Sequence, residues 1–220
     1  MSELILYNYF RSSTSYRVRI ALNYKKLKYQ YNAVHLLNNG GEQHNSDYKK
    51  LNPMSEVPTL IHNGATLGQS MAIIEYLDEV FPNPRLFPQD PQKRAQVRQF
   101  CENFNSFMHP VCNLKILQYL ESKHGYGQPE KEGWIAHWSK KGFEANENFL
   151  QKTHGKYCFG DEVTAADLFL IPQVFSAQRF KVDLTDYPLI RKINDNCLAL
   201  DFFKDAHPYR QVDTPKEEQV

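Results

Sequence analysis

Two different spacings of hydrophobic residues follow each other along this chain. In residues 1–82, short runs of β-forming residues alternate with segments whose apolar residues have helical spacing. The short runs predict strands over 4–10, 29–34, 58–63 and 65–68. The helical spacing predicts helices over 13–26 and 69–81. Asn63-Gly64 joins the last two strands as a hairpin turn. The order β-α-β, a loop or short helix near 47–51, then β-β-α predicts a mixed sheet with helices packed on it.

Prolines mark the end of this first part. Residues 81–91 hold four prolines in eleven positions, too many for a helix interior or a central strand. We therefore interpret residues 83–90 as a linker. Beyond it the apolar residues keep a helical spacing, which predicts an all-helical domain over 91–214. Residues 215–220 have little to bury and are predicted to form a frayed tail.

One segment of the second domain has a strong helix-start signal. Thr164 and Asp167 have the spacing of a capping box, with Asp in place of the usual Glu. The following turns are apolar on nearly every side, which predicts a central buried helix over 163–180 with a bend near Pro172. We assign Asp167 to capping rather than to chemistry.

The composition excludes several classes of protein. Hydrophobic residues make up 41% of the 220 residues and aromatic residues 13%, enough for a sizeable core. The 26 basic and 25 acidic residues give a net charge of +1, so neither nucleic acid nor an anionic membrane is expected as a partner. No run approaches the ~20 apolar residues of a membrane span, and residues 1–10 are too short and acidic for a signal peptide.

The cysteines have no paired spacing. This predicts reduced thiols in a cytoplasmic protein and makes a zinc site improbable. The four are Cys101, Cys112, Cys158 and Cys197.

A cluster of hydroxyl residues stands where the first strand gives way to a helix. Four of them, Ser12 to Ser15, follow Arg11 in a row. Serine and threonine are good helix caps, which is one interpretation. A hydroxyl at a helix N-terminus is also well placed to hold an anion, which is the other.

Five segments carry a resemblance to a known family. They are SSTSYRVRIAL (12–22), LNPMSEVPTL (51–60), QSMAIIEYL (69–77), GDEVTAADLFLIPQV (160–174) and RFKVDLTDYPLIRKI (179–193). With the order of elements, they resemble the zeta class of glutathione transferases over residues 4–214, although Thr14 and Tyr16 stand where that class usually has Cys and Trp. The resemblance implies an α+β two-domain glutathione transferase fold, with a thioredoxin-like N-terminal domain and an all-helical C-terminal domain.

The resemblance also implies a cofactor, glutathione, which reacts as its thiolate. The catalytic hydroxyl is expected at Ser12, with Ser13 and Thr14 beside it, and either Ser12 or Ser13 could contact the sulfur. Val57, before an expected cis-proline at Pro58, would pair with the cysteinyl backbone. The remaining glutathione contacts carried over from the family are Gln43, Gln69, Ser70, His109 and Asn113.

For the substrate, the family chemistry requires positive charge for carboxylates. Arg11 and Arg179 are the candidate cations, and Arg11 is also expected to be catalytic, as a donor to the developing enolate. His109 is a further substrate contact, whereas Arg17 and Arg19 are interpreted as structural. No metal is expected.

The reaction implied is glutathione-dependent cis–trans isomerisation of maleylacetoacetate, a step of tyrosine and phenylalanine breakdown. Three alternatives stay open: the same reaction on maleylpyruvate, glutathione transfer or dehalogenation on small α-halo acids, and a non-catalytic interaction protein with this fold. Family precedent also implies a homodimer.

Overall fold

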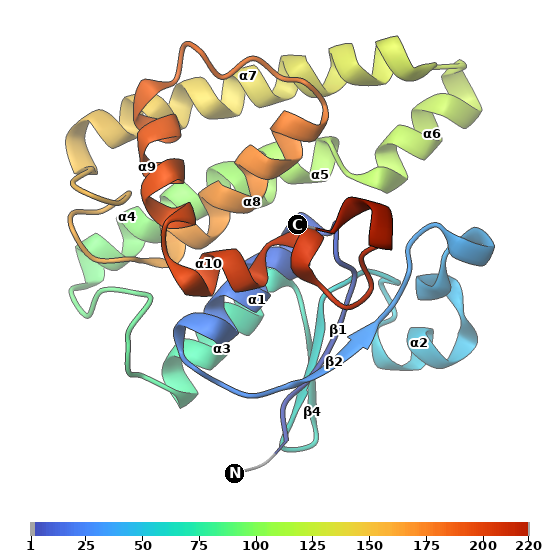
Figure 1. The fold of residues 1–220 in the computed structure, drawn as a ribbon, viewed down its shortest axis with the longest axis horizontal. Helices are drawn as coiled ribbons and strands as arrows, with labels where there is room; N and C mark the ends of the chain where they lie inside the picture. The colour runs from blue at the N-terminus through green and yellow to red at the C-terminus, as the bar shows by residue number, and fades with distance from the viewer. Residues whose placement is uncertain (1–2, 220) are drawn as a thin grey trace. The chain divides into compact units, whose positions relative to one another are not determined.

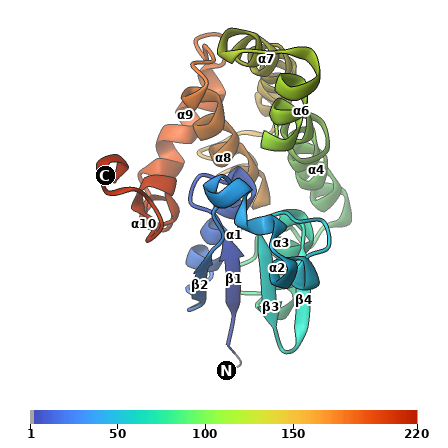
Figure 2. The ribbon, with the colours of Figure 1, turned by 90° about the vertical axis from the view of Figure 1, so that its right-hand side faces the viewer.

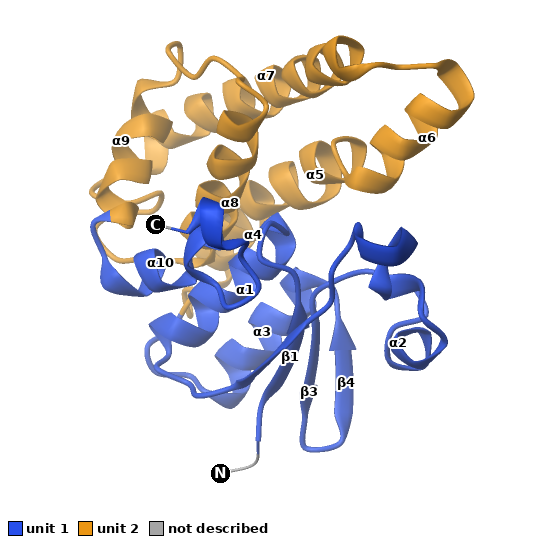
Figure 3. Cartoon of the chain, turned by 45° about the vertical axis from the view of Figure 1, so that its right-hand side comes forward, with its two compact units in different colours: residues 1–85, 199–220 blue, residues 86–198 orange. Residues whose placement is uncertain are grey.

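The computed structural model describes residues 3–219, which form two compact units. Unit 1 comprises Met1–Arg85 together with Ala199–Val220, and unit 2 comprises Leu86–Leu198 (Figure 3). The sequence thus leaves unit 1, builds unit 2, and then returns to unit 1.

The centre of unit 1 is a four-stranded sheet in the order β2-β1-β3-β4. Its strands are β1 (Ile5–Asn8), β2 (Gln30–Ala33), β3 (Thr59–His62) and β4 (Ala65–Gly68). β1 pairs in parallel with β2 and antiparallel with β3, and β3 pairs antiparallel with β4. The predicted hairpin is confirmed: Asn63 and Gly64, with φ of 51° and 78°, form the turn between β3 and β4.

Helices lie on both faces of this sheet (Figures 1 and 2). α1 and α3 pack against each other on one face, and α2 lies on the other. The helical elements of unit 1 are α1 (Ser13–Tyr24), α2 (Ser46–Leu51), α3 (Ser70–Val80) and α10 (Asp201–Ala206), with 3₁₀ turns at Asn38–Gly40, Glu42–His44, Pro208–Arg210 and Lys216–Glu218. The β-α-β and β-β-α order predicted from the sequence is confirmed.

Unit 2 is helical over its described length. It contains α4 (Pro91–Glu102), a π-helical stretch (Asn103–Met108), α5 (His109–Val111), α6 (Leu114–His124), α7 (Gln128–Thr153), α8 (Ala165–Arg179) and α9 (Pro188–Leu198). α8 packs against α4 and α9 and is buried along most of its length, as predicted. Among residues 3–219, no helix combines the length and the apolar character that crossing a lipid bilayer requires.

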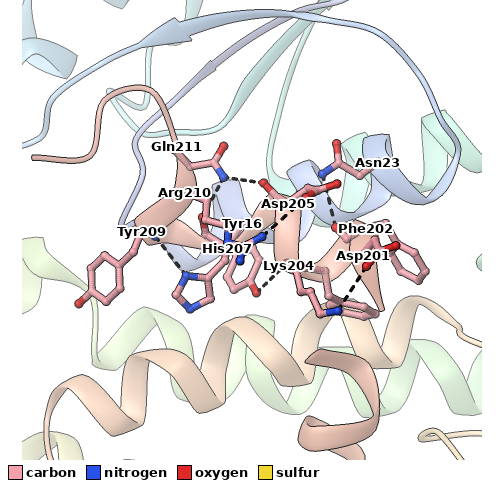
Figure 4. Close-up of polar contacts among 11 residues, drawn as sticks. Tyr16, Asn23, Asp201, Phe202, Lys204, Asp205, His207, Tyr209, Arg210 and Gln211 are labelled. Carbon is pink, nitrogen blue, oxygen red and sulfur yellow. Dashed lines mark hydrogen bonds and ion pairs between the residues drawn. The ribbon is translucent and has the colours of Figure 1, made fainter. Parts of the chain in front are cut away.

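The C-terminal segment corrects the predicted domain boundaries. The sequence analysis placed 91–214 in the helical domain and made 215–220 a frayed tail, but the structure groups 199–219 with unit 1. α10 packs on α1, and side chains of α1 donate to carbonyl oxygens of α10 (Figure 4). Tyr16 Oη donates to Phe203 O at 3.4 Å and Asn23 Nδ2 to Phe202 O at 3.4 Å. These long-range bonds leave no local pattern in the sequence.

Arg19 is the most heavily bonded side chain of α1. It is fully buried, with an exposed fraction of 0%. Its Nε donates to Ala206 O (3.1 Å), its Nη1 to Asn8 Oδ1 (3.0 Å) and Tyr9 O (3.3 Å), and its Nη2 to Phe10 O (2.9 Å). Burial lowers the pKa of this guanidinium, and nearby tyrosines and Asp213 oppose that change. One side chain therefore joins α1, the end of β1 and α10.

The predicted capping box of α8 is confirmed. Asp167 Oδ2 accepts from Thr164 N (2.8 Å) and Thr164 Oγ1 (3.3 Å), and Oδ1 accepts from Cys158 N (2.9 Å). Burial raises the pKa of Asp167, while these hydrogen bonds oppose the rise. The carboxylate thus fixes the start of α8 and the loop before it.

We expect Arg19→Leu to lower the free energy of unfolding by about 3 kcal/mol or more, because buried acceptors lose charged donors. Chemical denaturation followed by circular dichroism measures this. Arg191→Leu, at an exposed position of α9, is the matched control and should change stability by no more than about 0.5 kcal/mol. Equal effects of the two substitutions would show that the Arg19 contacts are energetically unimportant.

We expect Asp167→Ala to lower the free energy of unfolding by about 2–4 kcal/mol, because two buried backbone amides lose their acceptor. Soluble yield should fall with it, while kcat of the protein that does fold should stay the same. Thermal unfolding of this variant beside Asp195→Ala, an exposed aspartate of α9, measures the difference. A drop in kcat at unchanged stability is the result that contradicts a capping role.

Candidate active site

The hydroxyl cluster lies at the start of α1, directly after β1. A tight turn, closed by Ser12 N donating to Tyr9 O at 3.0 Å, brings the chain from β1 into the helix. Ser12 is the N-cap: its φ and ψ are −66° and 118°, and its Oγ accepts from Ser15 N at 3.2 Å. The capping interpretation of this residue is confirmed. It leaves the hydroxyl proton of Ser12 available for a second role.

The protons of the cluster can be assigned from its hydrogen bonds. Thr14 Oγ1 lies 2.9 Å from Val57 O, and a carbonyl only accepts, so Thr14 donates there. Ser12 Oγ lies 2.9 Å from Thr14 Oγ1, whose single proton is already used. Ser12 therefore donates to Thr14, and a chain of hydrogen bonds runs from Ser12 through Thr14 to Val57.

Val57 and its neighbours form the second wall of this site. The Val57-Pro58 peptide is cis, as predicted. The loop before it is held by Asn52 Nδ2 and Tyr48 Oη, which both donate to Glu56 O, at 2.8 and 2.7 Å. Burial raises the pKa of Tyr48 to about 12, so its hydroxyl remains a donor. Thr14 thus joins the start of α1 to an independently fixed loop.

Gln69 and Ser70 open α3 in an uncommon backbone geometry. Gln69 has φ of 66° and ψ of 115°, outside the regions that non-glycine residues populate. Such geometry clusters at ligand sites. Ser70, the first residue of α3, is buried, and its Oγ accepts from Arg17 Nη1 at 3.1 Å. Because Arg17 supplies that bond, the Ser70 proton can be donated to another acceptor.

Arg17 lies beside the start of α3, a contact that the sequence did not predict. It is fully buried, and it places a guanidinium beside the N-terminus of α3. The signal was present in its position: a basic residue one turn beyond Ser13 on a helix with few polar positions facing water. Its hydrogen bond to Ser70 Oγ fits the structural role predicted for it and also brings a positive charge to the start of α3.

Gln43 lies in the 3₁₀ turn Glu42–His44 and is only 8% exposed. Its Nε2 lies 3.4 Å from Leu36 O and 3.2 Å from His44 Nε2. Its Oε1 is buried and has no hydrogen-bond partner in residues 3–219. Gly41, with φ of 102°, makes room for this amide, because a Cβ there would lie 2.5 Å from Gln43 Nε2. A ligand with an N–H or O–H group would satisfy the oxygen.

His109 and Asn113 lie together in unit 2. Asn113 caps α6: its Oδ1 accepts from Lys115 N at 3.2 Å, which fixes the orientation of the amide. Its Nδ2 can then only donate, and it lies 3.2 Å from His109 Nε2. In this arrangement His109 Nε2 accepts from the Asn113 amide. The π-helical stretch Asn103–Met108 directly precedes this pair.

The two candidate cations differ in their surroundings. Arg179, the last residue of α8 in unit 2, is exposed, and its guanidinium stacks over the Phe180 ring at 5.5 Å. Arg11, in unit 1, is 27% exposed and forms an ion pair with Glu218. The sequence analysis had no reason to name Glu218, since it placed that residue in a frayed tail.

Of the predicted residues, the structure joins Ser12, Thr14 and Val57 by hydrogen bonds, and Arg17 joins α1 to Ser70. Chemically, a hydroxyl donor at the N-terminus of α1 can stabilise a thiolate. The N-terminus of α3, with Ser70 and Arg17, can receive a carboxylate. Unit 1 therefore has two helix starts with donors suited to an anion.

Comparison with known proteins agrees with this geometry. The family described as "Glutathione S-transferase, N-terminal domain" matches residues 2–79. Maleylacetoacetate isomerase of Rattus norvegicus is 49% identical over 213 residues, 97% of this chain and 96% of the rat protein. A solved maleyl pyruvate isomerase, described as a bacterial zeta-class glutathione transferase, superposes with a TM-score of 0.93 at 44% identity and covers 96% of this chain and 100% of its own.

A second solved structure carries informative ligands. Maleylacetoacetate isomerase from Anaeromyxobacter dehalogenans 2CP-1, with dicarboxyethyl glutathione and citrate bound in its active site, has a TM-score of 0.86 at 38% identity. It covers 97% of this chain and 98% of its own. The resemblance on which the sequence analysis relied, and the fold it implied, are confirmed. This chain belongs to the zeta-class glutathione transferase and maleylacetoacetate isomerase family.

Proposed function

We propose that this protein binds glutathione in unit 1 and uses it to isomerise maleylacetoacetate from the cis to the trans form. The observation that carries the proposal is the hydrogen-bonded chain Ser12–Thr14–Val57 at the N-terminus of α1. When glutathione binds, the Ser12 hydroxyl would rotate from Thr14 Oγ1 to the thiolate, and Val57 would offer a backbone edge to the cysteinyl residue. Relatives with this activity match nearly the whole chain.

Glutathione would lie along three features of unit 1. Its γ-glutamyl carboxylate is placed at the start of α3, where the Ser70 hydroxyl and the Arg17 charge meet it. Its cysteinyl backbone pairs with Val57. The unsatisfied Gln43 Oε1 accepts from a donor of the tripeptide. His109 and Asn113, in unit 2, are proposed as further contacts.

In the proposed reaction the sulfur of the thiolate bonds to one carbon of the cis double bond. The electron pair of that double bond moves to the neighbouring carbonyl and gives an enolate. Rotation about the resulting single bond follows, and the enolate then expels the thiolate to restore a trans double bond. No atom is gained or lost, so glutathione is returned unchanged. Arg11 and Arg179 are proposed to hold the substrate carboxylates.

The same chemistry on maleylpyruvate is the second candidate. It is favoured by the TM-score of 0.93 to a maleyl pyruvate isomerase. The two substrates differ in the acyl group beyond the maleyl double bond, so the relative kcat/KM values for them decide the matter. Dehalogenation of a small α-halo acid needs a cation for one carboxylate only, and a purely structural role needs none, so both candidates account for fewer of the two candidate cations, Arg11 and Arg179.

We also propose that the protein is a cytoplasmic homodimer, as its family precedent implies. Size-exclusion chromatography with light scattering tests the assembly, for which a chain of 25.7 kDa should give twice that mass.

We expect Ser12→Ala to lower kcat/KM for isomerisation by about 10²-fold, because one donor to the thiolate is lost. The ultraviolet absorbance of bound glutathione, titrated with pH, should show a raised thiol pKa. Ser13→Ala is the matched control and should behave nearly as wild type. The reverse ranking of the two variants would assign the catalytic hydroxyl to Ser13.

We expect Gln69→Gly to raise KM for glutathione about tenfold, because the amide side chain is lost. The same substitution should raise the free energy of unfolding by about 1 kcal/mol, because glycine removes the strain of the positive φ and the entropy that it adds to the unfolded chain costs less than that strain. Gln69→Ala loses the same amide but keeps the strain. It should raise KM equally without stabilising the fold. Steady-state kinetics and thermal unfolding separate the two effects, and an unchanged KM in both variants would remove Gln69 from the glutathione site.

A further inference from the structure

We propose that Glu218 is a specificity-determining residue. In the free enzyme its carboxylate forms an ion pair with the guanidinium of Arg11, and an acidic ligand that binds Arg11 must displace it. This inference rests on the proposed role of Arg11 in binding substrate. It concerns the C-terminal segment, to which that function assigns no part.

The segment that carries Glu218 is held on unit 1 by its own bonds. Asp213 Oδ2 accepts from Phe10 N at 3.0 Å, and Asp213 Oδ1 accepts from Tyr31 Oη. Thr214 is buried, and its Oγ1 donates to Pro208 O at 2.7 Å. The 3₁₀ turn Lys216–Glu218 then brings Glu218 to Arg11. Because Phe10 is the neighbour of Arg11, the same segment fixes both the backbone before the guanidinium and the anion against it.

The ion pair has the features of a displaceable one. The side chains of Arg11 and Glu218 are each 27% exposed, so water reaches both. Exposed pairs of this kind change an affinity by about 2- to 5-fold. A ligand carboxylate makes the same kind of bond to Arg11 as Glu218 does, so the two compete. Glutathione held along α1 and α3 has no reason to compete.

The competition has a chemical consequence for substrate choice. The binding free energy that a ligand gains from Arg11 is only the difference between two ion pairs, that of Arg11 with the ligand carboxylate and that of Arg11 with Glu218. Weakly held monocarboxylates therefore gain little, whereas a ligand with a second carboxylate anchored elsewhere can displace Glu218. The ligand class favoured is a glutathione adduct or substrate that carries two carboxylates.

The test measures binding of two probes, glutathione and dicarboxyethyl glutathione, by isothermal titration calorimetry. The adduct carries a dicarboxyethyl group on its sulfur, so it has two more carboxylates and a thioether in place of the thiol. Glu218→Gln should lower the Kd of the adduct about 2- to 5-fold and leave the Kd of glutathione unchanged. Glu217→Gln removes the same charge from the neighbouring exposed residue and should change neither Kd. In an Arg11→Gln background, Glu218→Gln should no longer affect the adduct.

An unchanged or raised adduct Kd in Glu218→Gln would overturn the inference, because Glu218 would then be a bystander or a support that orients Arg11. An equal effect of Glu217→Gln would also overturn it, since general charge would explain the result. Isomerase activity of the wild type is assayed separately. An inactive wild type with the expected Kd pattern refutes the proposed reaction and supports the role of Glu218, whereas an active wild type without that pattern does the opposite.

Discussion

The buried guanidinium of Arg19 is the constraint on which the site in unit 1 depends. The turn from β1 into α1 contains the carbonyl oxygens of Tyr9 and Phe10, which lie beyond the end of β1. The guanidinium of Arg19, from within α1, donates a hydrogen bond to each of them. A buried carbonyl needs such a donor. The turn can therefore be short and fixed, and Ser12 emerges from it in the geometry of a helix cap.

A second buried arginine, Arg17, bonds to the start of α3 as Arg19 bonds to the turn. Residues two positions apart on an α-helix point about 200° apart, so Arg17 and Arg19 leave α1 in opposite directions. Arg17 reaches Ser70 at the start of α3, and Arg19 reaches β1 and α10. The pair thus ties one helix to both helix starts and to the C-terminal segment. The charge of Arg19 is tolerated inside unit 1 because its guanidinium meets four oxygen acceptors.

The sequence predicted the parts of this protein that local patterns encode. The order of elements in residues 1–82, the Asn63-Gly64 hairpin, the Asp167 capping box and the cis peptide at Pro58 are confirmed. The cis peptide and the site residues came from family resemblance rather than from spacing.

The failures share a physical cause. α10, the destination of Arg17 and the contact of Glu218 with Arg11 all depend on side chains that meet partners far along the chain. A segment with few apolar residues, such as 215–219, can be held by hydrogen bonds and ion pairs that hydrophobic spacing does not record. Domain boundaries drawn from spacing therefore missed the return of the chain to unit 1.

That return has a consequence for how the protein is made. A ribosome releases residues 1–85 long before 199–219, yet α10 supplies carbonyl acceptors for the buried side chains of α1. During translation, Arg19 therefore lacks its acceptor Ala206 O until the whole of unit 2 has been synthesised. Unit 2 is contiguous and mainly helical, so it can fold as soon as it emerges. The unit whose synthesis begins first is thus completed only after unit 2, because residues 199–219 are translated after it.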